Sequence, residues 1–525
     1  MPVHSKPALP AGHGELLVAP PFDVWPQLAE QNARLAAGGS CSVAGRPVAE
    51  VRACARAEAL AAAEAFSERL GVAFDAAGEP SGLIVMTGHQ PQLYHPGVWI
   101  KDFLLQRLAD LTGATAVDVV VDTDGFDTVS VSSPCLVPEV RRCTQYLAVG
   151  SKGGYFAGAG VPDAEEVDRF CDAVAQQVST LPAPAIARHF ESFATALRES
   201  RARAGNLAEM LTTTRRLYEE PANSRYLELP TTSLARTDAF ATFAIDLALG
   251  EDRFLSAYNA ALADYRAVNR IRSQAQPFPD LVCEGGRFEL PLWVIADGRR
   301  ETLWARRVDG GIEFWNASEV LLRVDADPAE AIEALRDAPF IVAPKALALT
   351  LFARGFASDV FIHGVGGGGY DRVTDDVFRR YYGVEPPAFV VASITMYLAL
   401  GAHVVSDDEV SAARDRLNRL EHNPDALLGE VEFDSAEERD DAVALGREKA
   451  ELVAAIARPD ADKKALGLRI REVNAALAAM LEPLKQSLQA ELDTLEAQRA
   501  ASDVLTDRTY PYCFWSPQEV ADKAW

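Results

Sequence analysis

Cysteine is scarce in this chain, and the cysteines that are present follow no pattern. The 525 residues contain seven cysteines, an odd number, scattered without a CxxC pair. Zinc sites built on cysteine and the disulfide frameworks of small secreted domains both need regularly spaced cysteines. The sequence therefore predicts neither feature. Scattered thiols suit a reducing compartment, and we expect the protein in the cytoplasm.

Long uninterrupted apolar runs are also missing. The longest apolar stretch, Phe389–Val405, is interrupted by Ser393, Thr395, Tyr397 and His403. A helix that spans a membrane needs about 20 predominantly apolar residues. We interpret this stretch as buried core. The first residues contain no apolar segment typical of a secretory signal, and we expect no membrane partner.

Positive charge is in deficit. The chain has 51 lysines and arginines against 76 aspartates and glutamates, a formal net charge of −25. A surface that follows nucleic-acid phosphates needs an excess of lysine and arginine, so we expect no nucleic acid as a partner. A local basic pocket for a small anion remains compatible with this charge. No Walker loop, nucleophile elbow, HExxH or zinc pattern is present either.

The length and the segment order predict several domains. A chain of 525 residues is too long for one hydrophobic core. Short apolar runs alternate with helical segments, which predicts an α/β protein with a Rossmann-like parallel-sheet core, helical insertions and an antiparallel helical arm. The predicted parts are an N-terminal arm and helix (1–80), the first half of the core (81–150), a helical insertion (151–285), a small β meander (286–335), the second half of the core (336–405), a helical coiled-coil hairpin (406–505) and a tail that returns to the core (506–525).

The stretch from Leu83 to Asp127 predicts the βαβ unit around which the other segments are arranged. A short apolar run ends in a polar loop, and a segment with near-helical apolar spacing follows Pro96-Gly97. Gly113 is the expected end of this helix. A second apolar run, Ala116–Val121, ends in an acidic loop. Ligands of open α/β sheets bind at the carboxyl ends of parallel strands, so the polar residues at these ends are the candidates for a site.

Two histidines, a glutamine and a lysine follow the first predicted strand. If the helix begins near Val98, its first N–H groups and a nearby lysine would attract an anionic ligand. The alternative is a proline-bracketed turn whose histidines bond only to the backbone. His89 is a candidate acid or base. The candidate binding residues of this loop are Gly88, Gln90, His95 and Lys101.

Three carboxylates follow the second predicted strand in the pattern D-x-D-x-x-D. Asp124 and Asp127 are candidate catalytic residues that would orient an amine, and Asp122 is a candidate binding residue. Clustered carboxylates also bind Mg²⁺, but the remaining ligands of a calcium loop are missing and we predict no metal. The alternative is an Asx-type turn with a helix cap.

A glycine-rich segment, HGVGGGGY at His363–Tyr370, lies between a predicted strand and a predicted helix. It matches G-x-G-x-x-G, which is typical of a phosphate-binding loop, and ATP or ADP is the cofactor that this interpretation suggests. Consecutive glycines also suit any close backbone approach. No suitable acidic residue follows for a ribose, so NAD is not predicted. His363 is a candidate acid or base. The binding candidates are Gly364, Gly366, Gly367, Tyr370 and Asp371.

The last quarter of the chain predicts a helical arm. Between Asp460 and Ala500 apolar residues recur mostly at heptad spacing. This predicts one helix of roughly 40 residues, kinked at Pro483. The segments Asp407–Glu421 and Ala436–Ile456 would pack back against it. Such an arm is a natural dimerisation surface, and we expect a homodimer.

These motifs together resemble those of the bacillithiol biosynthesis cysteine-adding enzyme family (BshC). Thr87-Gly88-His89-Gln90 and His95-Pro96-Gly97 stand where that family has TGQQ-type residues and a G-P turn. The acidic loop is similar to an EDHD-type loop, and HGVGGGGY is similar to GGPGEIAY. The late helical insertion and the return of the chain also match. The first motif is similar, in addition, to the HQPxxxP start of WbqC-type sugar-biosynthesis proteins.

The resemblance implies a Rossmann-like core related to class I nucleotidyltransferases, a homodimer, and a ligase that adds cysteine to glucosaminyl-malate. His89 replaces a glutamine and Gly367 replaces a glutamate of the family motifs. Small-molecule substrates are therefore expected, and another amine-bearing substrate fits a divergent member. Two other functions stay open: a nucleotidyltransferase acting on a sugar phosphate, and a non-catalytic coiled-coil scaffold with a degenerate nucleotide pocket.

Overall fold

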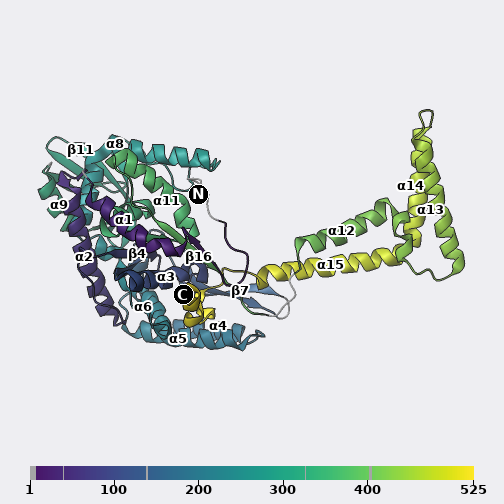
Figure 1. Cartoon of the computed structure of the whole chain (residues 1–525), viewed down its shortest axis with the longest axis horizontal. Helices are drawn as coiled ribbons and strands as arrows, with labels where there is room; N and C mark the ends of the chain where they lie inside the picture. Colours follow the sequence, from purple (N-terminus) through teal and green to yellow (C-terminus); the bar gives the residue numbers. More distant parts are fainter. Residues whose placement is uncertain (1–7, 40, 137–139, 326, 401–404) are drawn as a thin grey trace. The chain divides into compact units, whose positions relative to one another are not determined.

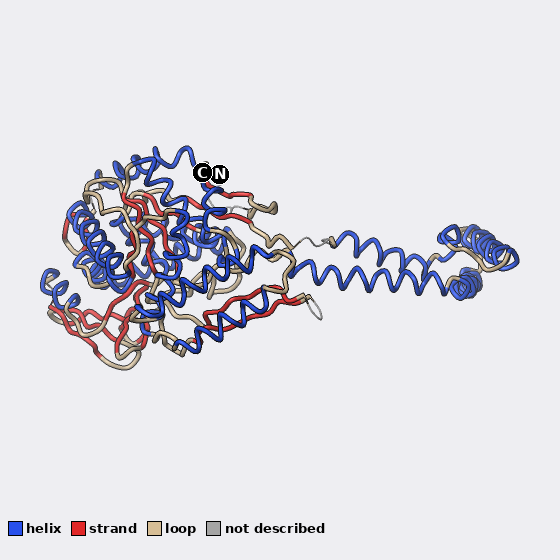
Figure 2. Tube along the Cα trace, turned by 90° about the horizontal axis from the view of Figure 1, so that it is seen from below, coloured by secondary structure: helices blue, strands red, loops and turns tan. Residues whose placement is uncertain are grey.

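The computed structural model describes residues 8–39, 41–136, 140–325, 327–400 and 405–525 (Figure 1). The chain forms two compact units. Unit 1 contains Met1–Cys135, Arg142–Leu398 and Arg508–Trp525, and unit 2 contains Leu136–Arg141 and Ala399–Asp507. Strands are concentrated in unit 1, whereas residues 407–505 are almost entirely helical (Figure 2).

Unit 1 is built on a six-stranded, mostly parallel sheet with the order β1-β16-β15-β4-β5-β8. Numbered along the chain, its parallel strands follow the order 3-2-1-4-5, the order of doubly wound sheets. The mixed α/β fold is therefore confirmed, and a Rossmann-like core is compatible with it. The parallel strands are β4 (Ile84–His89), β5 (Thr115–Val120), β8 (Leu227–Pro230), β15 (Val360–His363) and β16 (Val390–Thr395).

The parallel strands are buried on both faces. All six residues of β16 are buried, as expected for strands covered by helices on either side. Ile84 and Met86 of β4 share a core with Ala59 and Ala63 of α2 (Val48–Leu70). The predicted βαβ unit is confirmed, because α3 (Pro96–Thr112) connects β4 to the parallel strand β5 and ends at Gly113 in the left-handed conformation.

Two strands of this sheet come from segments that the sequence placed outside the core. Strand β1 (Glu15–Ala19) lies in the predicted N-terminal arm, but it pairs antiparallel with β16 at the sheet edge. Strand β8 lies in the predicted helical insertion, but it pairs with β5. Both predictions of domain membership were wrong. The strands have only five and four residues, too few to show a period of two.

A second, antiparallel sheet contains the predicted meander. Its strands run in the order β13-β12-β11-β10-β14, and β9 pairs with β10. The turn between β10 and β11 has positive φ at Asp297 and Gly298, which is typical of a tight hairpin turn. Residues 341–344 lie in the predicted second half of the core (336–405), but as β14 they belong to this sheet. The bounds are β9 (Cys283–Glu284), β10 (Arg287–Ala296), β11 (Arg299–Val308), β12 (Gly311–Trp315), β13 (Val320–Asp325) and β14 (Ile341–Pro344).

The other elements of unit 1 are helices and two short hairpins. Three helices between residues 164 and 219 lie in the predicted helical insertion (151–285). The helices are α1 (Trp25–Ala37), α4 (Ala164–Val178), α5 (Pro184–Arg203), α6 (Leu207–Glu219), α7 (Thr231–Leu234), α8 (Asp238–Val268), α9 (Pro328–Arg336), α10 (Ala346–Phe352), α11 (Val365–Val377) and α16 (Pro517–Ala524). The hairpins are β2 (Ser42–Val43) with β3 (Arg46–Pro47), and β6 (Thr128–Cys135) with β7 (Arg141–Val149).

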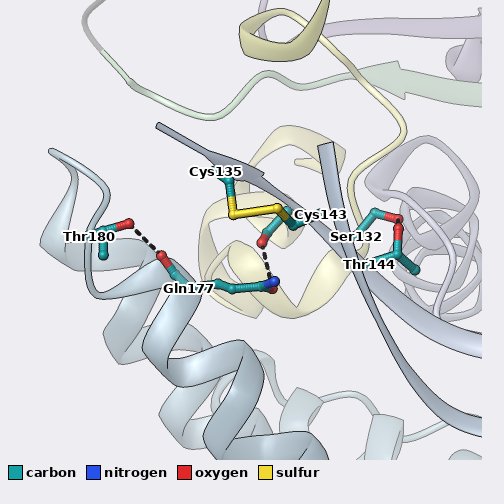
Figure 3. The surroundings of a disulfide bond; sticks show 7 residues. Ser132, Cys135, Cys143, Thr144, Gln177 and Thr180 are labelled. Carbon is teal, nitrogen blue, oxygen red and sulfur yellow. Dashed lines mark hydrogen bonds between the residues drawn. A yellow bond between two sulfur atoms is a disulfide. The ribbon is translucent and has the colours of Figure 1, made fainter. Parts of the chain in front are cut away.

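The hairpin of β6 and β7 carries a disulfide, which the scattered cysteines did not predict. Cys135 and Cys143 are joined across the two strands with their Cα atoms 5.9 Å apart (Figure 3). Beside them, the hydroxyls of Ser132 and Thr144 lie 2.8 Å apart. The sequence predicted no disulfide framework, and it did not indicate this single pair. The two cysteines are eight positions apart in the chain, and only the pairing of β6 with β7 brings them together.

Unit 2 consists mainly of two pairs of helices. Helix α12 (Asp407–His422) packs on α15 (Glu482–Leu505), and α13 (Ala436–Ile456) packs on α14 (Lys463–Met480). The single helix predicted between Asp460 and Ala500 is thus two helices, separated at Leu481. Pro483 lies in the first turn of α15, where its missing N–H costs no hydrogen bond. No described helix of either unit is long and apolar enough to cross a membrane.

Candidate active site

A cavity of about 760 Å³ lies in unit 1 at the carboxyl ends of β4 and β15. These are the first and fourth parallel strands, between which the strand order reverses, and ligands of doubly wound sheets bind at this place. The volume suits a small molecule. Eleven of the sequence candidates line the cavity: Gly88, His89, Gln90, His95, Lys101, Asp124, His363, Gly364, Gly366, Gly367 and Tyr370.

His89, at the end of β4, is an uncharged hydrogen-bond acceptor near neutral pH. Its Nδ1 lies 3.1 Å from the carbonyl oxygen of Gln90. A carbonyl only accepts, so Nδ1 carries the proton and Nε2 keeps its lone pair. Burial is the main cause that lowers the pKa of His89 to about 4. The imidazole can therefore accept a hydrogen bond from a ligand.

The N-terminus of α3 forms the next part of the wall. His95 is the N-cap residue, and its Nδ1 accepts a hydrogen bond from the backbone N–H of Gly97 at 3.0 Å. This contact fixes the entry of the chain into α3. The guanidinium of Arg508 lies close to Gly97 and donates to the carbonyl of Ile394 at 3.0 Å. The tail thus adds a positive charge that the sequence did not reveal.

Asp124 joins the two sheets at the cavity. Its carboxylate accepts a hydrogen bond from Gln90 Nε2 at 2.8 Å and forms an ion pair with Arg300 of β11. The guanidinium of Arg300 in turn lies 4.2 Å from the ring centre of Trp293, another residue of the cavity wall. Asp124 is held in place from both sides, and about a third of its side chain is exposed.

The other two carboxylates of the acidic loop do not share this position. Asp122 is buried and accepts hydrogen bonds from the hydroxyl of Thr231 at 2.6 Å and from the backbone N–H of Thr232 at 2.9 Å. Burial raises its pKa. Asp127 is exposed. Among the described residues that line the cavity, Asp124 is the only member of the D-x-D-x-x-D pattern. Successive residues of a turn point in different directions, so a linear pattern cannot place all three together.

His363, the last residue of β15, lines the same cavity as Asp124. Its Nε2 lies 2.9 Å from Asp371 Oδ2, although the two atoms are not aligned as a hydrogen bond. Asp371 also forms an ion pair with Arg354 at 2.6 Å. Burial raises the pKa of Asp371, but Arg354 and His363 together bring it below its usual range. Asp371, a predicted binding residue, therefore lies behind the wall and supports His363.

The glycine-rich segment is not a loop but the first turn of α11. Gly364 is the N-cap residue, and no side chain caps this helix. No heavy atom lies within 4 Å of a Cβ placed at Gly364 or Gly366, whereas a Cβ at Gly367 would lie 2.9 Å from His363 Nδ1. The first N–H groups of a helix lack partners within it and favour anions. The open side of this turn therefore fits a phosphate or a carboxylate.

The rest of the wall comes from elements that the sequence did not connect with the site. Lys345, before α10, forms an ion pair with Glu289 of β10 at 2.8 Å. Tyr370 and Phe278 meet edge to face with ring centres 4.9 Å apart, and burial raises the pKa of Tyr370 to about 12. Lys345 could have been found from the sequence, because it lies between a strand and a helix. The sequence contains no comparable signal that connects Phe278 or Trp293 with the site.

The site can hold a small molecule with an acidic group and an amine. No group of three histidine, cysteine, aspartate or glutamate side chains in the described part of the chain is arranged to hold a metal ion. No protein-family model matches the chain, and no curated protein matches it significantly.

Proposed function

We propose that the cavity is the active site of a BshC-like enzyme that forms a carbon–nitrogen bond. The substrates would be cysteine or another amine-bearing small molecule and a sugar-derived acceptor such as glucosaminyl-malate. One observation carries the proposal. Three motifs that lie far apart in the chain, at His89-Gln90, Asp124 and His363–Gly367, line a single cavity at the switch point of a doubly wound sheet.

The acidic part of the acceptor would bind at the first turn of α11. The space beside Gly364 and Gly366 is open, both glycines line the cavity, and Lys345 lines the same cavity. Helix N-termini and a nearby cation both stabilise carboxylates and phosphates. The same turn fits a phosphate of ATP or ADP. When bound, such a nucleotide supplies a leaving group for the activation of the acceptor.

The amine substrate would bind on the other side of the cavity. Asp124 offers a carboxylate that can orient an ammonium group, and His89 offers the lone pair of Nε2. Fixed orientation of two reactants lowers the entropic part of the barrier to their reaction. His363 is the acid or base on the acceptor side, held by Asp371.

The experiment that tests this function combines binding with product formation. A thermal-shift screen against ATP, ADP, cysteine and glucosaminyl-malate should raise the midpoint with at least one of them, because a ligand of the folded state stabilises it. Mass spectrometry should then detect the joined product. His89→Ala should abolish product formation and leave the thermal midpoint nearly unchanged. His422→Ala, at an exposed residue of α12 in unit 2, is the matched control.

Two results would contradict the proposal. If no ligand shifts the midpoint, the scaffold function with a degenerate pocket is favoured. If ATP binds and pyrophosphate is released with a sugar phosphate as co-substrate, the protein is a nucleotidyltransferase. The uncapped N-terminus of α11 favours this second function over the scaffold, because a degenerate pocket would not need an uncapped helix end in a cavity that Lys345 also lines.

We also propose that the protein is a cytoplasmic homodimer that associates through unit 2. Val443 and Val453 of α13 are about half exposed. A second copy would cover these side chains. Analytical ultracentrifugation should give twice the mass of the 56.7 kDa chain. The double substitution Val443→Lys and Val453→Lys should give the monomer mass, whereas a monomer in the unmodified protein would refute the dimer.

A further inference from the structure

Lys101 has an unusual environment for a lysine. It lies in α3, its side chain lines the cavity, and only 2% of its surface is exposed to solvent. The sequence suggested an exposed cation near a helix N-terminus that attracts an anionic ligand. A buried ammonium loses most of its hydration, which is costly unless a carboxylate compensates for it.

The hydrogen bonds of Lys101 match an uncharged amine. Nζ donates to Thr87 Oγ1 and to the carbonyl oxygen of Gly88, each at 3.0 Å. The hydroxyl of Thr87 donates its own proton to the carbonyl of Ile362 at 2.8 Å, so it only accepts from Lys101. A neutral amine has two N–H donors, and both are satisfied here. An ammonium would have a third N–H, which would need another acceptor.

The nearest carboxylates are bound by another cation. Asp102 of α3 and Asp118 of β5 raise the pKa of Lys101 by their charge, and the charge of Arg215 of α6 lowers it. Arg215 lies 2.7 Å from Asp118 Oδ2 and 3.2 Å from Asp102 Oδ2. Within the described residues, no carboxylate oxygen forms an ion pair with Lys101 Nζ at 4.0 Å or less.

Burial outweighs these carboxylates, and the pKa of Lys101 is lowered from its ordinary value. The other titratable side chain that faces Lys101 is His89 of β4, which is uncharged near neutral pH and does not stabilise an ammonium. Lysines tuned in this way by burial serve as general bases in enzymes. By contrast, Lys345 in the same cavity keeps a carboxylate partner in Glu289.

We propose that Lys101 is the general base that accepts the proton of the amine substrate. The inference rests on the proposed carbon–nitrogen bond formation and names the substrate class of the site, a primary amine that arrives as an ammonium ion. The lone pair of Lys101 Nζ takes one proton from the ammonium nitrogen. Lys101 becomes an ammonium, and the substrate nitrogen becomes a neutral amine with a free lone pair. That lone pair forms the new bond to the acceptor carbon, and the group bound to this carbon leaves with the electron pair of its own broken bond.

The charge of Lys101 is tested on the unmodified protein with cyanate. Isocyanic acid adds to unprotonated amines and forms a carbamoyl group, which peptide mass spectrometry locates. The rate at each lysine is measured from pH 6 to pH 11, divided by the concentration of isocyanic acid at that pH, and scaled to its own plateau at high pH; exposed Lys152 and Lys523 are the reference. Limited access slows labelling equally at every pH, so the midpoint of each scaled curve reports the protonation of that lysine. The exposed lysines should have a midpoint near pH 10.4. The midpoint expected for Lys101 is at least about one pH unit lower, a tenfold lower affinity for the proton.

A midpoint equal to that of the exposed lysines, or no label at any pH, would overturn the proposal. The base role is then tested by kinetics. Lys101→Met should lower kcat about 100-fold or more with little change in KM for the amine. Lys101→Ala should regain part of this loss on addition of methylamine. Product formation by the unmodified protein tests the proposed function by itself. If product forms and Lys101→Met keeps its kcat, the base role fails and the proposed function stands.

Discussion

Two adjacent glycines at the start of α11 differ in the space that a side chain would have. A Cβ at Gly366 would meet no heavy atom within 4 Å, whereas a Cβ at Gly367 would press on His363 Nδ1 at 2.9 Å. His363 cannot withdraw freely because Asp371 lies behind it. The glycine at 367 is therefore needed for packing, and the glycine at 366 leaves room for a ligand.

We expect Gly366→Ala to keep or raise the free energy of unfolding by about 0.5 kcal/mol, since alanine favours a helix over glycine. Gly367→Ala should lower it by about 1–3 kcal/mol, the usual cost of overpacking. Urea denaturation of both variants measures the difference. Ligand affinity should fall in both, through lost space in the first and a displaced His363 in the second. Equal stability of the two variants would contradict the packing role of Gly367.

The sequence predicted many residues of the site because they follow strands. His89 and His363 end β4 and β15, and the carboxyl ends of parallel strands meet at one edge. Asp122 and Asp127 were not placed correctly, since the direction of each side chain in a turn depends on its local hydrogen bonds. Arg300 and Trp293 were missed because they come from a separate sheet, and only tertiary packing brings them to Asp124.

At the scale of elements, unit 2 owes its helix pairs to a few buried apolar residues. Leu477 of α14 is fully buried against Ala442 of α13 and Val473, whereas Leu468 of the same helix is 52% exposed. Removing a buried leucine side chain leaves a cavity, and removing an exposed one does not. The two leucines therefore form a matched pair for measuring how much the buried side chains stabilise the packing of α13 on α14.

Leu477→Ala should destabilise the pair of α13 and α14 by about 2–5 kcal/mol. Leu468→Ala should change it by less than about 0.5 kcal/mol, because alanine is an equally good helix former. Hydrogen exchange of peptides from these two helices, followed by mass spectrometry, reports their local opening. Similar exchange rates in both variants would show that the two helices do not depend on this core.

The type of an element was easier to predict than its partner. The spacing of apolar residues identified α3, because a period of 3.6 is visible over its length. Residues 341–344 were assigned to the second half of the core, whereas β14 belongs to the antiparallel sheet. A strand of four residues carries no information about its neighbour. The break at Leu481 was also hidden, since the heptad spacing continues across it.

At the scale of the whole molecule, buried charges make stability depend on pH. Glu228 of β8 is fully buried and accepts hydrogen bonds from Arg215 at 2.6 Å and Arg216 at 3.3 Å. Burial is the largest influence and raises the pKa of Glu228 to about 7. An unfolded glutamate loses its proton near pH 4.3. Between these values the folded state holds one more proton than the unfolded state.

The free energy of unfolding should therefore fall as the pH rises from about 4.5 to 7, by at most about 1.4 kcal/mol per pH unit from this group. Urea denaturation at several pH values measures the slope. Glu228→Gln should flatten it, because an amide cannot lose the proton. Glu437→Gln, at an exposed residue of α13, should leave it unchanged. An equal slope in all three proteins would contradict the raised pKa of Glu228.

The pairing of β1 with β16 has a consequence for synthesis on the ribosome. Glu15 pairs with Thr395, 380 residues later in the chain. At 5–20 residues per second, roughly 20–75 s pass between the emergence of these two strands. During this time β1 has apolar side chains but no partner strand, a state that favours aggregation. The nascent N-terminal segment should therefore be a binding site for chaperones until the last strand of the central sheet has emerged.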